Sequence, residues 1–359
     1  MRPGSHLARA LDALGATLDD PLVQEHVRRA EFDRDGKLWL DLEGGPAWWR
    51  FDDPGVVRVE PREDERLPLA RRLGDVRDDA ILAWRPGRRV VAAIGEGDST
   101  VIHKGHRRSR FARALARQRA AARIGEQCSF AVPALVDVDE AAATLVLARV
   151  DGLEPGFARS DADDFRTIGR GIAEMQAADP GCELDRHTAQ DELDVVDATH
   201  RRLVRAIGRG LDGFELLRER VAALAPRANE TFVPCHRDLH DRQFLLGANG
   251  PSLLDFDSLC EADSALDPAN LLAHVALRRL QGLAGVDAQG ARACSEALVD
   301  GLGPVVDRTF FEHLRFYQST SLLRLACVYA IRPRWSHLGP CLVGLAQRCA
   351  DDEHAGSIR

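Results

Sequence analysis

The spacing of apolar residues divides the chain into a strand-rich first part and a helix-rich second part. Before residue 151, short apolar runs alternate with turn residues such as Gly and Pro, which is typical of β-strands. From Gly152 onward, helical patterns dominate, and apolar residues recur every three or four positions, as expected when one helix face is buried. In residues 163–178 these positions are Phe165, Ile168, Ile172 and Met175. The pattern predicts an α+β fold.

Two groups of strands are predicted in the first part of the chain. Residues 1–75 form a small module with helices at 7–14 and 21–30 and strands at 37–42 and 46–51, to which we assign no chemistry. The second group surrounds an Arg- and Ala-rich helix at residues 110–124. Its strands are residues 80–85, 89–94, 100–104, 131–138 and 143–150.

The second part contains a short hairpin among its helices. Residues 244–246 and 252–256 are apolar runs separated by the turn sequence G-A-N-G-P, which predicts two antiparallel strands. The predicted helices are residues 163–178, 188–211, 214–224, 305–323, 324–331 and 338–349.

Two motifs flank this hairpin. Residues 235–243 read C-H-R-D-L-H-D-R-Q, and residues 253–257 read L-L-D-F-D. The order H-R-D-L-x-x-x-Q and then D-F-D is that of a kinase catalytic loop followed by its metal-binding segment. In that arrangement Asp238 accepts the proton of the attacking hydroxyl, whereas Gln243 and Asp255 hold Mg²⁺ on the nucleotide phosphates. Asp257 is a candidate for a further metal ligand.

With residues 265–272, A-L-D-P-A-N-L-L, these motifs resemble the aminoglycoside phosphotransferase and choline kinase-like family of small-molecule kinases. The resemblance covers residues 80–350 and implies a two-lobed protein-kinase-like fold. A small antiparallel-sheet N-lobe of residues 76–150 would bind the nucleotide, and a mainly helical C-lobe of residues 151–359 would carry the catalytic loop and the acceptor pocket. Residues 1–75 would be an extra N-terminal α/β cap module.

A lysine is expected on the third strand of such an N-lobe, where its ammonium neutralises nucleotide phosphates. Lys104 ends the V-I-H-K run of residues 101–104 and is, with Lys37, one of two lysines in a chain with 48 Lys and Arg residues. The alternative is a surface lysine on a strand. Gly87 and Arg88, in the turn between the first two strands, could cover the phosphates or form a plain hairpin turn.

Three further assignments follow from the resemblance. The family pairs the strand lysine with a Glu on the following helix, but residues 110–123 contain no Glu, so Gln118 is the nearest substitute and Glu126 a fallback. Backbone groups of Ala148 and Val150 would pair with the adenine edge, unless this segment is an ordinary strand end. Where this chain has Gln243 the family has Asn, which offers the same carbonyl oxygen on a shorter stem.

Three residues near the catalytic loop have structural interpretations. Asp267 precedes Pro268, so we expect its side chain to cap a helix, although the resemblance also implies that it braces the catalytic loop. We expect His236 to pack and hydrogen-bond beneath the loop rather than act as a base. Asp241 could face the substrate, but we expect it to face solvent.

Composition narrows the class of partner. Apolar residues make up 45% of the chain, charged residues 29%, and the net charge is −8, which argues against a nucleic-acid partner and is compatible with a cationic or neutral one. No apolar stretch approaches the length of about 18 residues that a membrane span needs. The eight cysteines form no C-x-x-C pair, so we expect no zinc site or disulfide framework and a cytoplasmic location.

These observations predict an ATP- and Mg²⁺-dependent phosphotransferase acting on a hydroxyl of an aminoglycoside, an amino sugar or a sugar. A different class stays open: a catalytically impaired, nucleotide-binding pseudokinase, in which Gln243 and the missing helix Glu mark lost catalysis. The choice of ATP or GTP and the oligomeric state also stay open. Carboxylates that could bind an aminated acceptor, or could be solvated helix caps, are Asp161, Asp163, Asp164, Asp191, Glu192 and Asp194.

Overall fold

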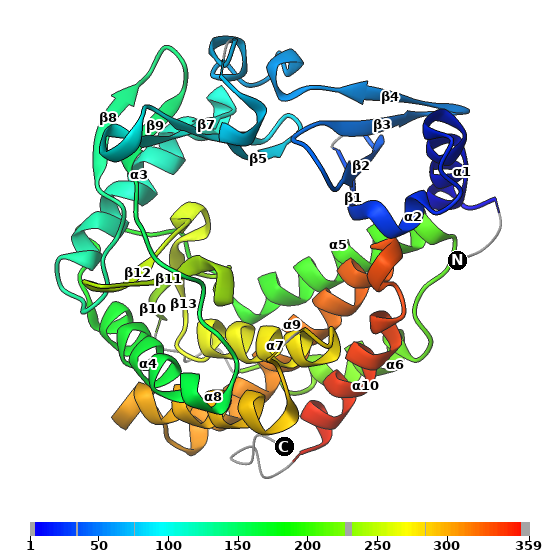
Figure 1. Ribbon diagram of the computed structural model, residues 1–359. Helices are drawn as coiled ribbons and strands as arrows, with labels where there is room; N and C mark the ends of the chain where they lie inside the picture. The colour runs from blue at the N-terminus through cyan, green and yellow to red at the C-terminus, as the bar shows by residue number, and fades with distance from the viewer. Residues whose placement is uncertain (1–3, 34, 75, 227–231, 284, 353–359) are drawn as a thin grey trace.

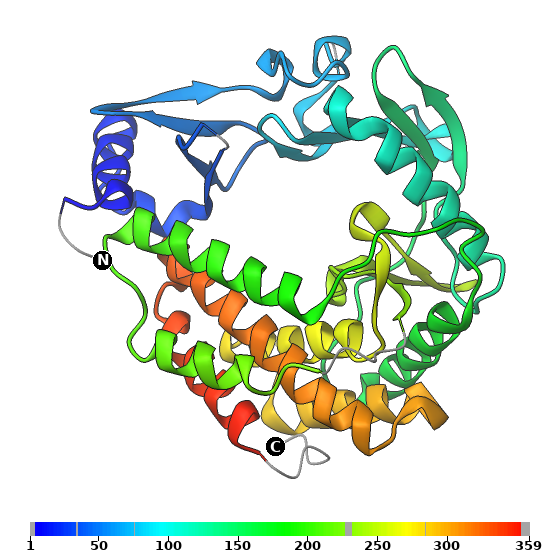
Figure 2. The ribbon, with the colours of Figure 1, turned by 180° about the vertical axis from the view of Figure 1, so that it is seen from behind.

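The computed structural model describes residues 4–33, 35–74, 76–226, 232–283 and 285–352. Figure 1 shows a sheet-rich half of the molecule facing a helical half, and Figure 2 shows the same arrangement from behind. The sheet-rich half consists of an N-terminal module and an N-lobe side by side, and the helical half is the C-lobe. The predicted two-lobed α+β fold is therefore confirmed.

The N-terminal module is a four-stranded antiparallel sheet in the order β1-β2-β3-β4 with two helices. Its elements are α1 (His6–Leu18), α2 (Val23–His26), β1 (Val27–Phe32), β2 (Leu38–Leu42), β3 (Trp48–Asp52) and β4 (Gly55–Val59). The prediction of a helix over residues 21–30 was wrong beyond His26, because residues 27–32 pair with β2 in a register that sets Phe32 opposite Leu38. Strand β4 was not predicted.

Apolar side chains on both faces of β2 are buried. Leu38 and Leu40 are fully buried in the core cluster that also contains the C-lobe helices. Trp39 points to the opposite face and lies 6.3 Å from Trp84 of the N-lobe, measured between ring centroids. Because side chains alternate along a strand, one face of β2 packs against the C-lobe and the other face packs against the N-lobe.

The N-lobe is a five-stranded antiparallel sheet in the order β5-β6-β7-β9-β8, and helix α3 (Arg108–Gly125) follows β7. Each strand overlaps one that the hydrophobic pattern predicts. The strands are β5 (Ile81–Arg85), β6 (Arg89–Ile94), β7 (Val101–His106), β8 (Leu135–Asp139) and β9 (Thr144–Ala148).

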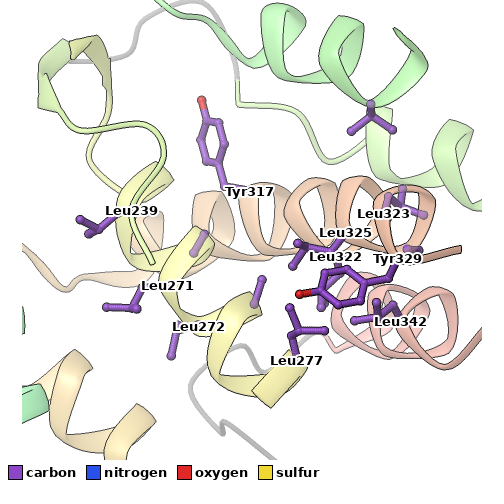
Figure 3. Close-up of a cluster of buried hydrophobic side chains, with 14 of the residues drawn as sticks. Leu239, Leu271, Leu272, Leu277, Tyr317, Leu322, Leu323, Leu325, Tyr329 and Leu342 are labelled. Atoms are coloured by element: carbon purple, nitrogen blue, oxygen red, sulfur yellow. The ribbon is translucent and has the colours of Figure 1, made fainter. Parts of the chain in front are cut away.

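Seven helices form the described part of the C-lobe: α4 (Ala162–Ala177), α5 (Ala189–Ile207), α6 (Phe214–Ala222), α7 (Leu266–Leu280), α8 (Ala288–Leu302), α9 (Arg308–Ala330) and α10 (Leu338–Asp351). Helix α9 is continuous where two helices were predicted, and α8 was not assigned. Figure 3 shows leucines of α7 and α9 packed together, with Leu239 of the catalytic loop beside Leu271 of α7. The catalytic loop is therefore anchored in the core by a fully buried leucine.

Two short antiparallel sheets hold the motif residues. Strand β10 (Phe232–Cys235) pairs with β13 (Cys260–Asp263), and β11 (Phe244–Gly247) pairs with β12 (Gly250–Leu253). The second pair is the predicted hairpin. Backbone bonds between Leu153 and Leu246 tie the chain that leaves the N-lobe to this hairpin. In the described parts of the chain, no helix is both long and apolar enough to cross a bilayer.

Replacing Leu40 by Ala tests the packing of the module. Leu40 is 0% exposed, so Leu40→Ala removes buried contacts and should lower the free energy of unfolding by about 2–5 kcal/mol. Urea denaturation followed by circular dichroism measures the change. Leu82→Ala in β5 is the control, because Leu82 is 57% exposed and its loss should cost well under about 1 kcal/mol. Equal losses in the two variants would contradict the described burial.

Candidate active site

Helix α7 holds the catalytic loop from below through Asp267. This side chain is fully buried, and its carboxylate accepts hydrogen bonds from the backbone N–H of His236 at 2.6 Å and of Arg237 at 2.7 Å. The prediction that Asp267 caps the helix was wrong. It lies inside the first turn of α7, whose N-cap residue is Ala265 and has no side-chain bond to the helix. Asp267 therefore braces the loop, as the resemblance also implied.

Two more contacts fix the loop. His236 is fully buried, and its Nε2 lies 2.8 Å from the carbonyl oxygen of Leu254, which confirms that it packs beneath the loop and ties the loop to the segment before Asp255. Asp241 was expected to face solvent. Instead it is buried and forms a bidentate ion pair with Arg278 of α7, with N–O distances of 2.9 and 3.0 Å.

Asp238 lies between these supports. Its side chain is half-buried and forms no hydrogen bond or ion pair with any other residue that the structure describes. The neighbouring carboxylates of Asp241 and Asp267 are both engaged by protein groups. Asp238 is therefore a carboxylate that the loop positions but leaves available to a partner from outside the protein.

Four charged side chains meet where the lobes face each other. Lys104 Nζ lies 2.7 Å from Asp255 Oδ1 and 2.7 Å from Asp257 Oδ1. Arg89 Nη1 lies 2.8 Å from both carboxylate oxygens of Asp255 and 2.9 Å from Asp257 Oδ2. Lys104 and Arg89 come from the N-lobe and the two aspartates from the C-lobe. We call these four residues the ion network.

The charges of the ion network stabilise one another. Burial alone would raise the pKa of Asp255, but the neighbouring charges of Lys104 and Arg89 outweigh it and hold this pKa well below its ordinary value. Burial likewise opposes the charge of Arg89, yet Asp255 and Asp257 raise the pKa of its guanidinium. Asp255, Asp257 and Arg89 therefore stay charged at neutral pH.

The backbone at Asp255 is unusual for a residue with a side chain. Its φ of 64° and ψ of 55° lie in the left-handed region, where a non-glycine residue costs about 1–3 kcal/mol. Arg237, in the catalytic loop, has a φ of 68°. Strained conformations persist where the surrounding contacts enforce them, and these two lie on the two motif segments.

Sequence reasoning missed Arg89 and His106. The register of β6 and β7 sets Arg89 opposite His106 and Val91 opposite Lys104. Because side chains alternate between the faces of a sheet, Arg89, His106 and Lys104 share one face. Pairing the two predicted strands in this register would have revealed both residues.

His106 is 4% exposed, and its Nε2 is buried without a hydrogen-bond partner among the described residues. Burial, only partly offset by the charge of Asp257, lowers the pKa of its imidazole from 6.5 to about 4. The histidine is therefore neutral at physiological pH.

Helix α3 carries Gln118, the residue expected to pair with Lys104. Gln118 is buried, and its Nε2 donates to the carbonyl of Pro133 at 2.9 Å, while the partners of Lys104 are Asp255 and Asp257. The carboxylate of Asp257, from the motif itself, occupies that place beside the ammonium. Arg117, the neighbour of Gln118, donates to the backbone oxygen of Asp257.

The turn between β5 and β6 contacts the N-terminal region. Gly87 has a φ of 64°, and its N–H donates to Asp64 Oδ2 at 2.6 Å, while Arg88 Nη1 lies 3.9 Å from Glu31 Oε2. At the other end of the sheet, the N–H of Ala148 donates to Ala134 at 2.8 Å. A contact from Ala148 to a nucleotide base would therefore use its carbonyl oxygen. Val150 lies just beyond the end of β9.

The expected metal ligands include two carboxylates that already share a cation. No cluster of three or more His, Cys, Asp or Glu side chains suited to a metal occurs in the described ranges. Asp255 and Asp257 nevertheless converge on one cation, Arg89 Nη1. Gln243 is buried, with its Nε2 3.2 Å from His240 Nε2, which leaves its amide oxygen available as a metal ligand. Oxygen donors of this kind fit Mg²⁺, whose remaining ligands are usually phosphates and water.

Several acidic residues considered for the acceptor have structural partners. Asp161 accepts from the N–H of Ala158 at 2.7 Å, and Asp191 accepts from the N–H of Thr188 at 2.8 Å. Glu192 is buried against His187, with 2.6 Å between its Oε1 and the histidine Nε2. Asp191 thus belongs to a capping box with Thr188 at the start of α5, and Asp161 makes the equivalent bond in the 3-10 helix η5 (Arg159–Asp161).

Replacing His106 tests its burial as a neutral side chain. Its pKa in the folded chain, about 4, lies below its ordinary value of 6.5, so protons favour the unfolded state and stability falls as the pH drops from 6.5 toward 4. Between pH 7.5 and 5, wild type should lose about 2 kcal/mol more than His106→Gln. Urea denaturation at both pH values measures the difference. His26→Gln, which changes an exposed side chain, is the control, and parallel losses in wild type and His106→Gln would contradict the assignment.

Solved structures of several small-molecule kinases have a similar fold. A putative aminoglycoside phosphotransferase from Ralstonia eutropha gives a TM-score of 0.53 at 12% identity, covering 79% of this chain and 97% of that one. The choline kinase LicA from Streptococcus pneumoniae gives 0.51 at 13% identity, covering 75% and 91%. The GDP complex of wild-type aminoglycoside 2'-phosphotransferase-IIIa gives 0.50 at 12%, covering 79% and 96%. At such identities the likeness shows the fold alone.

No curated protein matches the sequence. A family model does match it, over residues 76–300, which span the N-lobe and the C-lobe through helix α8 and include both motifs. The resemblance noted in the sequence is thereby confirmed. This chain belongs to the phosphotransferase enzyme family.

Proposed function

We propose that this protein is an ATP- and Mg²⁺-dependent phosphotransferase that phosphorylates a hydroxyl group of a small molecule. The observation that carries the proposal is the convergence of Lys104 with Asp255 and Asp257 at 2.7 Å, on a segment that His236 ties to the loop of Asp238. Phosphoryl transfer depends mainly on positioning and on neutralising charge, and these residues supply both.

The nucleotide would lie between the lobes with its phosphates on Lys104. Arg89 and the turn of Gly87 and Arg88 would add positive charge and backbone N–H groups around the phosphates. The adenine edge would meet backbone groups of Ala148 and Val150. Asp255, Asp257 and Gln243 would hold Mg²⁺, which neutralises the charge on the transferred phosphoryl group.

Arg89 would then change partners. In the structure its guanidinium is bound by both aspartates of the motif. With these carboxylates holding Mg²⁺, the guanidinium of Arg89 would turn to the anionic oxygens of the phosphates within the same site. Guanidinium groups bind phosphate oxygens well, so the exchange need not leave a buried charge unpaired.

Asp238 would orient the acceptor hydroxyl and take its proton. A carboxylate is a weak base, but a loose transition state needs little assistance from a base, so position matters more than basicity. Asp267 and the pair of Asp241 with Arg278 supply that position from α7. An aminoglycoside, an amino sugar or a neutral sugar would each provide a suitable hydroxyl.

One observation supports the pseudokinase alternative. The two aspartates that should bind Mg²⁺ are satisfied by Arg89 and Lys104, so the protein has a stable charge balance without metal. A pseudokinase would keep this arrangement when a nucleotide binds. The two functions differ in whether nucleotide binding depends on Mg²⁺.

Replacing Asp238 by Asn tests the catalytic role. Asp238→Asn should lower kcat by about 100-fold or more, because the acceptor proton loses its base, while the Kd for ATP changes by less than about threefold. A coupled assay for ADP measures turnover, and calorimetry measures nucleotide binding. Asp300→Asn is the control, because Asp300 is 67% exposed and has no assigned role. Wild-type turnover in Asp238→Asn would refute the role.

Thermal unfolding separates the enzyme from the pseudokinase. ATP should raise the Tm of wild type clearly more with Mg²⁺ than with EDTA, because the aspartates of the ion network would bind Mg²⁺ and its cations would bind the nucleotide. Asp255→Asn removes a carboxylate from the metal site and should abolish the Mg²⁺-dependent part of the shift. Asp300→Asn, which changes a 67% exposed side chain, should behave as wild type does. A shift of equal size in Mg²⁺ and in EDTA would favour the pseudokinase.

A further inference from the structure

Four arginines from three parts of the chain surround one carboxylate. Glu31 lies in β1, and the arginines are Arg29 of β1, Arg85 and Arg88 at the turn between β5 and β6, and Arg332 after α9. Burial would raise the pKa of Glu31, but the charges of all four arginines lower it below its ordinary value. We call these four arginines the basic cluster.

The basic cluster has too few counter-charges. Arg88 lies 3.9 Å from Glu31, and Arg29 lies 4.0 Å from Asp41. The side chains of Arg85 and Arg332 form no ion pair or hydrogen bond with any residue in the described ranges. Arg332 lies over the ring of Tyr329, with 4.3 Å from its guanidinium carbon to the ring centroid. The guanidinium groups of Arg85 and Arg332 therefore lie near Glu31, whose carboxylate already pairs with Arg88.

Solvent reaches this cluster. The side chain of Arg88 is 46% exposed and that of Arg29 is 38% exposed. Arg85 and Arg332 are both half-buried. A dissolved anion could therefore reach the cluster from the side of Arg29 and Arg88.

Tertiary contacts hold the contributing segments together. Strand β1 packs against the short 3-10 helix η9 (Pro333–Trp335), which follows Arg332, and Figure 1 shows the end of α9 close to this strand. Arg334 Nη1 lies 3.0 Å from Glu43 Oε1 and ties the same segment to the module. The contact between Trp39 and Trp84 fixes the module against β5. The cluster is thus built from residues far apart in sequence.

The basic cluster borders the candidate active site through the N-lobe sheet. Arg88 directly precedes Arg89, which binds Asp255. Arg85 is the strand partner of Arg89, so the two side chains lie on the same face of the N-lobe sheet. The nucleotide phosphates have their own cations in Lys104 and Arg89. The basic cluster, with members from the N-terminal module and from the end of α9, is therefore available to a different anion.

We propose that the basic cluster binds an anionic group of the acceptor, so that the substrate is an alcohol carrying a phosphate, sulfate or carboxylate group. The proposal rests on the proposed function and names the substrate class of the same site. Arginine offers paired N–H donors that match the oxygens of these anions. A protonated amine, by contrast, would be repelled by the unpaired guanidinium groups.

Calorimetric titration of the full chain with sodium sulfate, at constant ionic strength set by chloride, tests the site without catalysis. Wild type should bind sulfate, and the double variant Arg85→Gln/Arg332→Gln should bind it at least about tenfold more weakly, because two unpaired cations are lost. Arg308→Gln removes a positive charge from the 92% exposed start of the same helix α9 and should bind within about twofold of wild type. Arg332→Lys should retain most of the binding.

Three outcomes would overturn the site. One is the absence of sulfate binding to wild type, and another is unchanged binding by the double variant. The third is loss of binding in Lys104→Ala with full binding in the double variant, which would assign the anion to the nucleotide site. A loss in Arg332→Lys as large as that in Arg332→Gln would indicate a packing role for the side chain and would also count against the site.

Kinetics with Mg-ATP then test the substrate class. Glucose, glucosamine, glucuronate and glucose 6-phosphate share one scaffold and differ in charge. The anionic sugars should have kcat/KM values at least about tenfold above that of glucose, and the double variant should raise their KM. Preference for glucosamine would overturn the anionic class and leave the kinase intact. Unimpaired turnover by Asp238→Asn would instead refute the mechanism, and if no sugar is phosphorylated, the sulfate titration decides.

Discussion

The arrangement of the active site depends on the pairing of opposite charges across the two lobes. Lys104 and Arg89 approach from the N-lobe, Asp255 and Asp257 from the C-lobe, and each cation contacts both carboxylates. Charges with little access to water are costly unless they are paired. The network therefore holds the two lobes together at this point, and it keeps Asp255 and Asp257 ionised.

Helix α7 gives the catalytic loop its shape. Asp267 binds two loop N–H groups, Arg278 binds Asp241, and Asn270 Nδ2 donates to the carbonyl of Leu239 at 2.9 Å. Together they occupy the polar groups around Asp238 and leave that carboxylate without a protein partner among the described residues. The residues of α7 thus position the loop, whereas Asp238 would meet the substrate.

The parts of the site that the sequence could predict are those that lie close together along the chain. Asp238, Asp255 and Asp257 stand at fixed spacings in two motifs, and Lys104 stands on a strand that its apolar pattern predicts. Arg89 and His106 depend on the register of two strands, and their residue types carry no local signal. The roles of Asp241 and Asp267 depend on contacts between the loop and α7, about thirty residues away. In the module, pairing with β2 decides that residues 27–32 form a strand rather than a helix.

The N-terminal module has a consequence for how the two lobes can move. The chain passes directly from the N-lobe to the C-lobe near Leu153, where backbone bonds join it to Leu246. The sheet of the module forms a second connection, because Leu40 is buried with the C-lobe while Trp39 contacts Trp84 of the N-lobe. A rotation that widens the interlobe space about one connection must shear the packing of the other. Exchange of bound molecules should therefore proceed by small twisting displacements of the lobes, with the tryptophan contact as the interface that slides.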